Sequence, residues 1–304
     1  LTIPCEMCIR DRLYAGTDHG AFWVSKNDGE SWEEHSTGIA NNYIRSISPS
    51  HHKASRVYMA MTGINYDDLK SYLYASEDFG MTWKTIAAGL PDEPINVVKE
   101  DPSNENILYA GTVRGVYVSI DRGKNWSYLG TNMPATAVAD LEIYLPNMDL
   151  VVGTHGRGIY KTSLLPIQKM VSENLPEDKD YFFEIGKTAR PWFNSSHGEP
   201  DYRTVEKATF SFWLSQSKPV TISVVDQSNT EIWKTNLTGF KGFNQYRWDL
   251  IVKKGTSDNP YFIHYDQFIK AGVYKVKIIS AEDHLEQNLE ITDGKSPYIV
   301  RDNF

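Results

Sequence analysis

Two octapeptides decide how this chain folds: SEDFGMTW at residues 76–83 and SIDRGKNW at residues 119–126. Both fit the pattern Ser-x-Asp-x-Gly-x-x-Trp, and a third copy, SKNDGESW at residues 25–32, has Asn27 in place of the aspartate. The pattern predicts a hairpin turn, because an Asp carboxylate can accept hydrogen bonds from backbone N–H groups across a bend. The glycine permits a positive φ angle, and the tryptophan covers the junction with apolar surface.

The two aspartates lie near aromatic residues and could pass for catalytic acids, but the turn chemistry also offers the octapeptides a role in the fold. The structural set comprises Ser25, Asn27, Gly29, Trp32, Ser76, Asp78, Gly80, Trp83, Ser119, Asp121, Gly123 and Trp126.

A short apolar strand recurs four times around the octapeptides. The copies are LYAGT at 13–17, VYMAMTG at 57–63, LYAGT at 108–112 and LVVGT at 150–154. Their starts lie roughly 40 to 50 residues apart, which is the length of a four-stranded propeller blade. Counting strands gives about three and a half blades over residues 13–165. Because an open array would leave two unpaired sheet edges, we expect the fragment to begin in the middle of a propeller.

The blade pattern breaks after residue 165, where residues 166–204 carry prolines and charges and are predicted to be a linker and an irregular segment. Six alternating strands then predict a β-sandwich over residues 205–293, followed by a tail at 294–304. The strands are expected at residues 208–214, 220–226, 231–235, 243–250, 272–279 and 285–291. The fold class is therefore all-β, with a partial propeller followed by a sandwich.

The N-terminus holds the only two cysteines, Cys5 and Cys8, in a C-x-x-C spacing. Such a pair could bind a metal or act in redox chemistry, but no second pair exists to complete a zinc site. Residues 6–12 read EMCIRDR, which resembles a translated sequencing adapter. We expect residues 1–12 to be an artefact or a disordered N-terminus, and we predict neither a metal site nor a cofactor.

The octapeptide resembles the Asp-box, or BNR, motif, and residues 13–165 resemble the propellers of sialidases, sortilin-type receptors and two-propeller xyloglucanases. The segment GTHGRGIY at 153–160 is similar to the closing segment of such propellers. In the sandwich, GFN at 242–244 with WDL at 248–250, and AGVY at 271–274, resemble the Ig-like domain of the flagellar hook-cap type. That domain follows propellers in many secreted bacterial proteins of sortilin-like or BNR-repeat type.

The resemblance implies that the Asp-box turns are elements of the fold rather than catalytic groups, and that they lie on the face opposite the binding site. The turns expected on that opposite face carry polar side chains, including Asp18, Asp67 and Asp68. Arg, His and Tyr there could hold a carboxylate or sugar hydroxyls, although polar residues are also ordinary in exposed hairpins. The candidate ligand-binding residues are His19, Tyr66, Arg114, His155 and Arg157.

The net charge of −8 argues against nucleic acid as a partner, because phosphates require a basic surface. No apolar run approaches the roughly 20 residues that cross a bilayer. His197, Glu199 and Asp201 can ligate metals but lack a known ligand spacing, so they are interpreted as part of a solvated loop.

We expect a non-catalytic binding or scaffold module that engages protein or glycan through its loop face, in a bacterial protein that is secreted, periplasmic or displayed on the cell surface. The alternative is a fragment of a glycoside hydrolase, sialidase-like or xyloglucanase-like. A xyloglucanase needs two carboxylates that face each other across a cleft, and these would lie mostly upstream.

Overall fold

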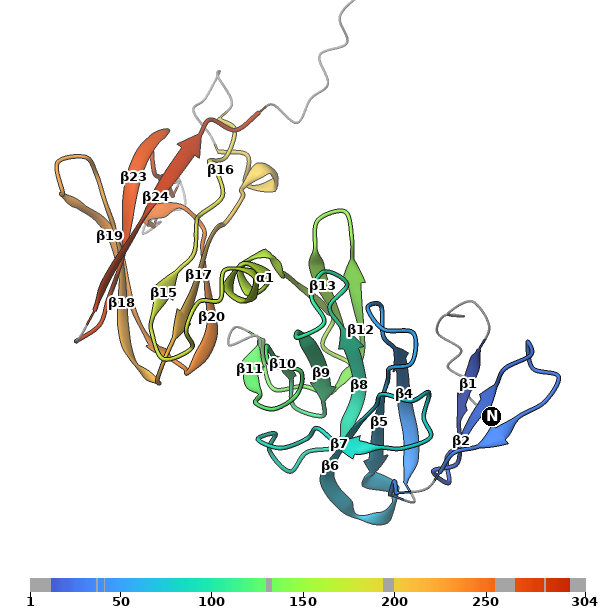
Figure 1. Cartoon of the computed structure of the whole chain (residues 1–304). Helices are drawn as coiled ribbons and strands as arrows, with labels where there is room; N and C mark the ends of the chain where they lie inside the picture. Colours follow the sequence, from blue (N-terminus) through green and yellow to red (C-terminus); the bar gives the residue numbers. More distant parts are fainter. Residues whose placement is uncertain are drawn as a thin grey trace, which may run out of the picture. The chain divides into compact units, whose positions relative to one another are not determined.

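The computed structural model describes residues 12–36, 38–40, 42–129, 133–193, 200–254, 266–281 and 283–295. The chain divides into two units, Leu1–Pro176 and Glu177–Phe304, and nearly all described elements are strands (Figure 1). Cys5, Cys8, His197 and Glu199 lie outside the described residues, so the predictions made for them stay predictions.

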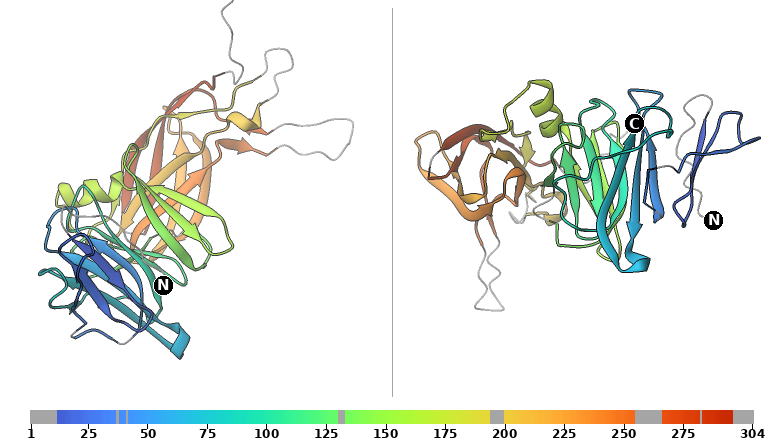
Figure 2. Two further views of the ribbon diagram at one scale, coloured as in Figure 1. Left: turned by 90° about the vertical axis from the view of Figure 1, so that its right-hand side faces the viewer. Right: turned by 60° about the horizontal axis from the view of Figure 1, so that its bottom comes forward.

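The first unit consists of four antiparallel sheets, in which consecutive strands pair in an up-and-down order (Figures 1 and 2). Sheet A contains β1 (Leu13–Gly16), β2 (Phe22–Ser25) and β3 (Glu33–Glu34). Sheet B contains β4 (Tyr43–Pro49), β5 (Val57–Gly63), β6 (Asp68–Ser76) and β7 (Lys84–Thr85), with a 3-10 turn η1 (Ile64–Tyr66) before β6. Sheet C contains β8 (Ile95–Glu100), β9 (Leu108–Thr112), β10 (Val116–Ser119) and β11 (Ser127–Leu129). Sheet D contains β12 (Val138–Tyr144), β13 (Asp149–Thr154) and β14 (Ile159–Ser163). The four repeated strands of the sequence correspond to β1, β5, β9 and β13.

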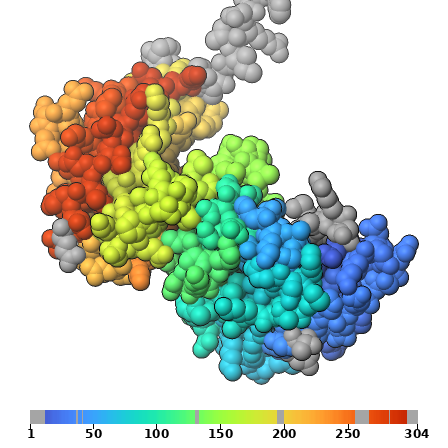
Figure 3. All heavy atoms as spheres, viewed as in Figure 1, coloured from blue at the N-terminus to red at the C-terminus, as the bar shows by residue number. Residues whose placement is uncertain are grey.

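Neighbouring sheets pack through their apolar faces, with β4, β8 and β12 next to one another. One core joins sheets A and B, where the ring of Phe22 meets the edge of Trp83 at 4.9 Å between centroids. A second core joins sheets B and C, where Leu73 and Val98 are buried. In the space-filling view the sheets follow one another in chain order, from blue to green (Figure 3).

Helix α1 (Leu165–Ser172) follows β14, with a proline in its first turn, where the missing N–H costs nothing. Ile167 and Met170 are buried on one side of it. The Gln168 amide donates hydrogen bonds to the carboxylate of Asp101, which is 2.9 Å away at its nearer oxygen. The helix is therefore tied to the loop between β8 and β9.

The second unit contains two larger sheets around one core. Sheet E has the order β15 (Tyr181–Phe182), β17 (Ala208–Leu214) and β20 (Gly242–Trp248). Sheet F has the order β16 (Thr188–Ala189), β24 (His284–Thr292), β23 (Gly272–Ile279), β18 (Lys218–Val225) and β19 (Glu231–Gly239). Two short strands, β21 (Ile251–Lys253) and β22 (Gln267–Phe268), pair separately. Phe210 and Trp248 of sheet E and Ile222 and Val276 of sheet F belong to the same buried cluster, so side chains of the two sheets fill the space between them.

The segment 166–204 differs from the predicted linker. It contains most of α1, the strands β15 and β16, and a 3-10 turn η2 (Tyr202–Thr204). The two strands are each two residues long, and β15 joins sheet E only through Tyr181 and Phe182, opposite Trp213 and Phe212. Strands of two residues show no alternation of polar and apolar side chains, so the prolines and charges around them predict a linker instead.

Candidate functional site

The three octapeptides form turns with the same hydrogen bonds. The hydroxyls of Ser25, Ser76 and Ser119 accept the N–H of the glycine four residues later, at 2.8, 2.8 and 2.7 Å. The side-chain oxygen of the Asn or Asp residue then accepts the N–H four residues beyond it, at 2.8 to 2.9 Å in all three turns. The three glycines have φ angles between +80° and +92°, which non-glycine residues rarely adopt. Each turn links the last two strands of its sheet.

The tryptophans of the second and third turns join neighbouring sheets. The indole N–H of Trp83 donates to the carbonyl of His35, the residue after β3, at 3.2 Å. The indole N–H of Trp126 donates to the carbonyl of Ile86, the residue after β7, at 2.9 Å. The two rings therefore occupy equivalent places against the preceding sheet. Trp32 of sheet A is 39% exposed.

The predicted ligand-binding residues lie in the turns at the other end of the sheets. His19 is exposed and contacts the carboxylate of Asp18 at 2.5 Å. Tyr66 ends η1 and is 62% exposed. Arg114 lies between β9 and β10, while His155 and Arg157 lie between β13 and β14, and all three are exposed. Their positions in separate turns do not by themselves make a site.

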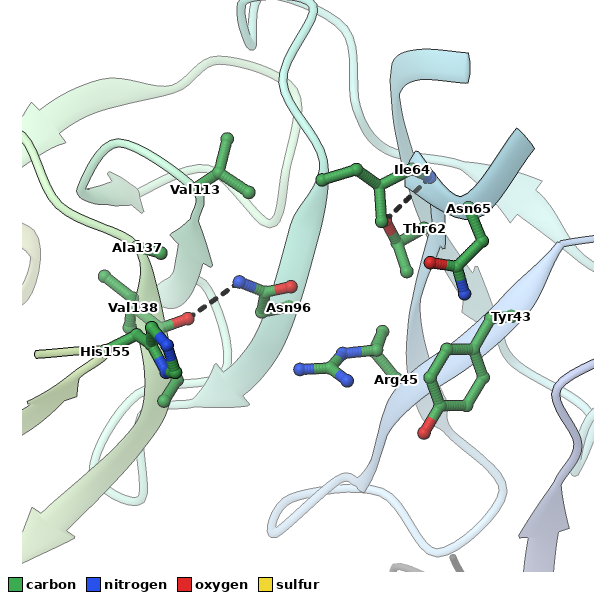
Figure 4. Close-up of a pocket in the computed structure, with 11 residues that line it drawn as sticks. Tyr43, Arg45, Thr62, Ile64, Asn65, Asn96, Val113, Ala137, Val138 and His155 are labelled. Atoms are coloured by element: carbon green, nitrogen blue, oxygen red, sulfur yellow. Dashed lines mark hydrogen bonds between the residues drawn. The ribbon is translucent and has the colours of Figure 1, made fainter. Parts of the chain in front are cut away.

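A cavity of about 270 Å³ opens among sheets B, C and D, and of the five predicted residues only His155 lines it (Figure 4). Its other lining residues are Tyr43, Arg45, Thr62, Ile64, Asn65, Asn96, Val113, Ala137, Val138 and Ala139. The backbone N–H of His155 is held by the carbonyl of Ala137 at 2.8 Å, which fixes the start of this turn beside β12.

The cavity residues come from three equivalent irregularities. The pairing register shifts across Arg45 in β4, across Asn96 in β8 and across Ala139 in β12. A β-bulge adds one residue to a strand and re-aims side chains locally. The structure thus places one bulged residue from each first strand at the same cavity.

Arg45 supplies the positive charge of the cavity. Its guanidinium carbon lies 5.4 Å from the centre of the Tyr43 ring, within the range of a cation–π contact. In Figure 4 the Arg45 side chain extends away from β4 toward the side of the cavity that holds Asn96 and His155. Within the described part of the chain, Arg45 has no carboxylate partner, so its N–H donors are available to a ligand.

Amide and hydroxyl groups complete the polar lining. The Asn96 amide donates to the carbonyl of Val138 at 2.8 Å, which fixes the side chain and leaves its oxygen as an acceptor. Asp68 lies beside η1 but does not line the cavity, and it accepts the hydroxyl of Tyr72 at 2.5 Å. That hydrogen bond, followed by one from the backbone of Lys70, lowers the pKa of Asp68. None of the lining residues is Asp or Glu, so the cavity favours an anionic or hydrogen-bonding ligand.

Sequence reasoning missed Tyr43, Arg45, Thr62 and Asn96. Strand alternation would place Tyr43, Arg45 and Ile47 on one face, yet Ile47 is buried and Arg45 is exposed. The available signal was a lone arginine inside YIRSISP, a segment otherwise suited to a buried strand.

In the part of the chain that the structure describes, no three His, Cys, Asp or Glu side chains cluster in a way that could hold a metal ion. None of its helices has the length and apolar character needed to span a membrane.

Comparison with known proteins relates the first unit to a family. The family model described as sortilin, neurotensin receptor 3, matches residues 20–133, which is less than half of the chain. This range runs through strands of sheets A, B and C, and the match supports a sortilin-like β-propeller for the first unit. No curated protein sequence matches the chain significantly.

Three solved structures are similar to the chain at low identity. The GH74 xyloglucanase of Xanthomonas campestris has 14% identity and a TM-score of 0.41, and the match covers 92% of this chain and 45% of that chain. YCF48 bound to a D1 peptide has 10% identity and a TM-score of 0.38, with 95% and 84% covered. An ancestral GH74 enzyme has 14% identity and a TM-score of 0.37, with 95% and 40% covered. The chain thus spans less than half of both GH74 structures.

Proposed function

We propose that the chain is a non-catalytic binding module, in which sheets A to D are blades of a β-propeller and the second unit is an Ig-like spacer or attachment domain. The propeller engages a protein or glycan ligand through the face that carries the β5–β6, β9–β10 and β13–β14 turns. We further propose that the full-length protein is bacterial and acts outside the cytoplasm, in secreted, periplasmic or surface-displayed form.

The observation that carries this proposal is the cavity around Arg45. Three sheets contribute to it, its charge comes from a guanidinium without a carboxylate partner in the described residues, and Asn96 and His155 add hydrogen-bonding groups. Arginine binds carboxylates through two parallel N–H bonds, and the Tyr43 ring offers a face for stacking. An acidic side chain of a protein ligand and the hydroxyls of a glycan both fit this chemistry.

Arg45→Ala tests the proposal on glycan and peptide arrays probed with the whole chain. We expect ligands of the wild-type chain to lose about tenfold or more in affinity, since hydrogen bonds to charged groups contribute about 1.5–3 kcal/mol. Arg45→Lys should keep part of the affinity, because it retains the charge but not the planar fork. Lys84→Ala, an exposed substitution on β7, serves as the control and should bind like the wild type. Unchanged binding by Arg45→Ala would remove the cavity as the site.

The alternative function is that of a glycoside hydrolase fragment. One of the two GH74 structures is a xyloglucanase and the other an ancestral GH74 enzyme, but catalysis of that kind needs two opposed carboxylates. The Arg45 cavity is not lined by any Asp or Glu, so both groups would have to come from elsewhere. Release of reducing ends from array-positive glycans, lost on mutating acids of the same face, would favour this alternative over the binding module.

A further inference from the structure

The second unit carries a groove of about 340 Å³ between its two sheets, separate from the Arg45 cavity. Trp233 of β19 and Tyr246 and Trp248 of β20 line it, and Ile251 and Val252 of β21 continue it. β19 is the outermost strand of sheet F, and β20 is the outermost strand of sheet E. Since both are edge strands, no further strand of either sheet covers the groove in the described part of the chain.

Aromatic rings form one wall of this groove. The rings of Trp233 and Trp248 stack with centroids 4.8 Å apart and planes 26° apart, and Tyr246 lies 5.8 Å from Trp233. Trp248 is buried and its indole N–H donates to the carbonyl of Ile251, so its fixed ring supports the ring of Trp233 that stacks on it. Trp233 and Tyr246 remain partly exposed. The electron-rich faces of such rings attract the C–H edges of a sugar.

The polar ends of the two exposed rings are unused. Within the described residues, the Trp233 indole N–H and the Tyr246 hydroxyl have no hydrogen-bond partner. One is a donor and the other is a donor and acceptor, so together they match the hydroxyl groups of a saccharide lying on the rings.

The rim of the groove is cationic. Lys207 precedes β17, Arg247 lies in β20 and Lys254 follows β21, and all three line the groove together with a single acidic residue, Asp249. In the part of the chain that the structure describes, none of the three cations forms an ion pair. This local excess of positive charge contrasts with a net charge of −8 for the whole chain. Three unpaired cations from three separate segments fit a ligand with more than one negative charge.

We propose that this groove binds an acidic polysaccharide, with a pyranose ring stacked on Trp233 and Tyr246 and its carboxylates paired with Lys207, Arg247 and Lys254. The volume lies at the lower end of the 300 to about 1,000 Å³ typical of ligand sites, and the open edges let a chain continue beyond it. Nucleic acid fits less well, because proteins that bind single strands track many phosphates along a basic channel.

Calorimetric titration of the full chain tests this with tetrasaccharides of galacturonate, alginate and hyaluronan. At least one should bind, and its affinity should fall as salt is added. The fully methyl-esterified galacturonate tetrasaccharide, which keeps the rings and loses the charges, should bind much more weakly. Failure of all three acidic probes, or equal binding of the ester, would overturn the proposal, as would tighter binding of a single-stranded oligonucleotide of equal charge.

Single substitutions separate the contribution of the cationic rim of the groove from that of its aromatic wall. Lys207→Ala and Lys254→Ala should each weaken binding about two- to fivefold, as expected for exposed charge pairs. Lys270→Ala removes another exposed lysine of this unit that does not line the groove and should leave affinity unchanged. Trp233→Ala should weaken binding at least about tenfold, with far-ultraviolet circular dichroism checking the fold.

Tyr246→Phe keeps the ring, removes only the hydroxyl, and should weaken binding less than Trp233→Ala. Equal affinities for Lys254→Ala, Lys270→Ala and wild type would exclude this groove. Since Arg45→Ala leaves the groove intact, failure here and failure of the propeller-face proposal are independent results.

Discussion

The inner sheets B and C and the terminal sheet D carry equivalent positions with opposite exposure. The residue paired with the fourth position of the repeated strand is Leu73 in sheet B, opposite Ala60, and Val116 in sheet C, opposite Gly111. These two side chains are 0% and 2% exposed. The equivalent residue in sheet D, Ile159, is 77% exposed. Val118 of sheet C is likewise buried, whereas Lys161 replaces it in sheet D and is exposed. A strand of the same local pattern is buried only where a neighbouring sheet covers it.

The octapeptide tryptophans show the same dependence on a neighbouring sheet, in this case on the sheet that precedes their own. Trp83 and Trp126 each bond to the sheet before their own, whereas Trp32 is 39% exposed and makes no such bond within the described residues. The exposed face of sheet A is apolar at this position, while the exposed face of sheet D carries Lys161. Burial in this unit therefore arises between repeats rather than within one, as in other repeat architectures.

The largest expected effect distinguishes an inner from a terminal position. Leu73→Ala should destabilise sheet B by about 2–5 kcal/mol, because it leaves a cavity in a filled core. Ile159→Ala should change stability by less than about 0.5 kcal/mol, because the side chain is already in water. Urea-dependent hydrogen exchange in β5, β6 and β13 measures the two free energies. A cost of similar size at both positions would show that neighbouring sheets do not supply the burial.

The tryptophan of the octapeptide gives a smaller contrast. Trp126→Phe removes the hydrogen bond to the Ile86 carbonyl and should cost about 0.5–1.5 kcal/mol. Trp32→Phe removes no such bond in the described residues and should cost less than about 0.5 kcal/mol. Hydrogen exchange of the β10 amides measures the effect of Trp126→Phe relative to wild type. Hydrogen exchange of the β2 amides measures the effect of Trp32→Phe in the same way. If Trp32→Phe proves the more damaging, Trp32 is covered in solution.

The parts of this fold that could be predicted from sequence are those fixed by local chemistry. The octapeptides specify their own turns, since Ser119, Asp121 and Gly123 bond within four residues of one another. The six long strands of the second unit were visible because alternating side chains cover at least five residues each. His155 could be named as a candidate because the resemblance to Asp-box propellers implies that its turn lies on the face opposite the octapeptides.

The Arg45 cavity could not be predicted, because it depends on register. The bulges at Arg45 and Asn96 appear only when β4 is paired with β5 and β8 with β9, and the lone arginine of β4 does not by itself reveal a bulge. The groove at Trp233 has the same difficulty, because it needs β19 and β20 to be edges of different sheets. In each case residues far apart in sequence meet through pairing that single-strand patterns do not encode.

The smallest expected effect concerns acid stability, and it compares the turns that hold aspartate with the one that holds asparagine. Burial alone would raise the pKa of Asp121, but hydrogen bonds from the backbone and side chain of Asn125 and from Ser119 outweigh it and lower the pKa below 3.8. The pKa of Asp78 is lowered by the same balance, with bonds from Thr82 and Ser76. A carboxyl group whose pKa is lower in the folded chain than in the unfolded chain stabilises the fold at pH values above its unfolded pKa. This stabilisation is lost as the pH falls through the pKa of the folded chain.

Asp121→Asn should therefore make sheet C less sensitive to acid below about pH 4, while keeping the turn, since Asn27 accepts the matching bonds from Ser25 and Ser31 in sheet A. The reciprocal variant Asn27→Asp should make sheet A more sensitive over the same range. Tryptophan fluorescence during acid titration at fixed urea measures both midpoints. The two variants exchange only a carboxylate and an amide. If the acid midpoints of both variants shifted in the same direction, the geometry of the turn, rather than its charge, would set the difference in acid sensitivity between the two sheets.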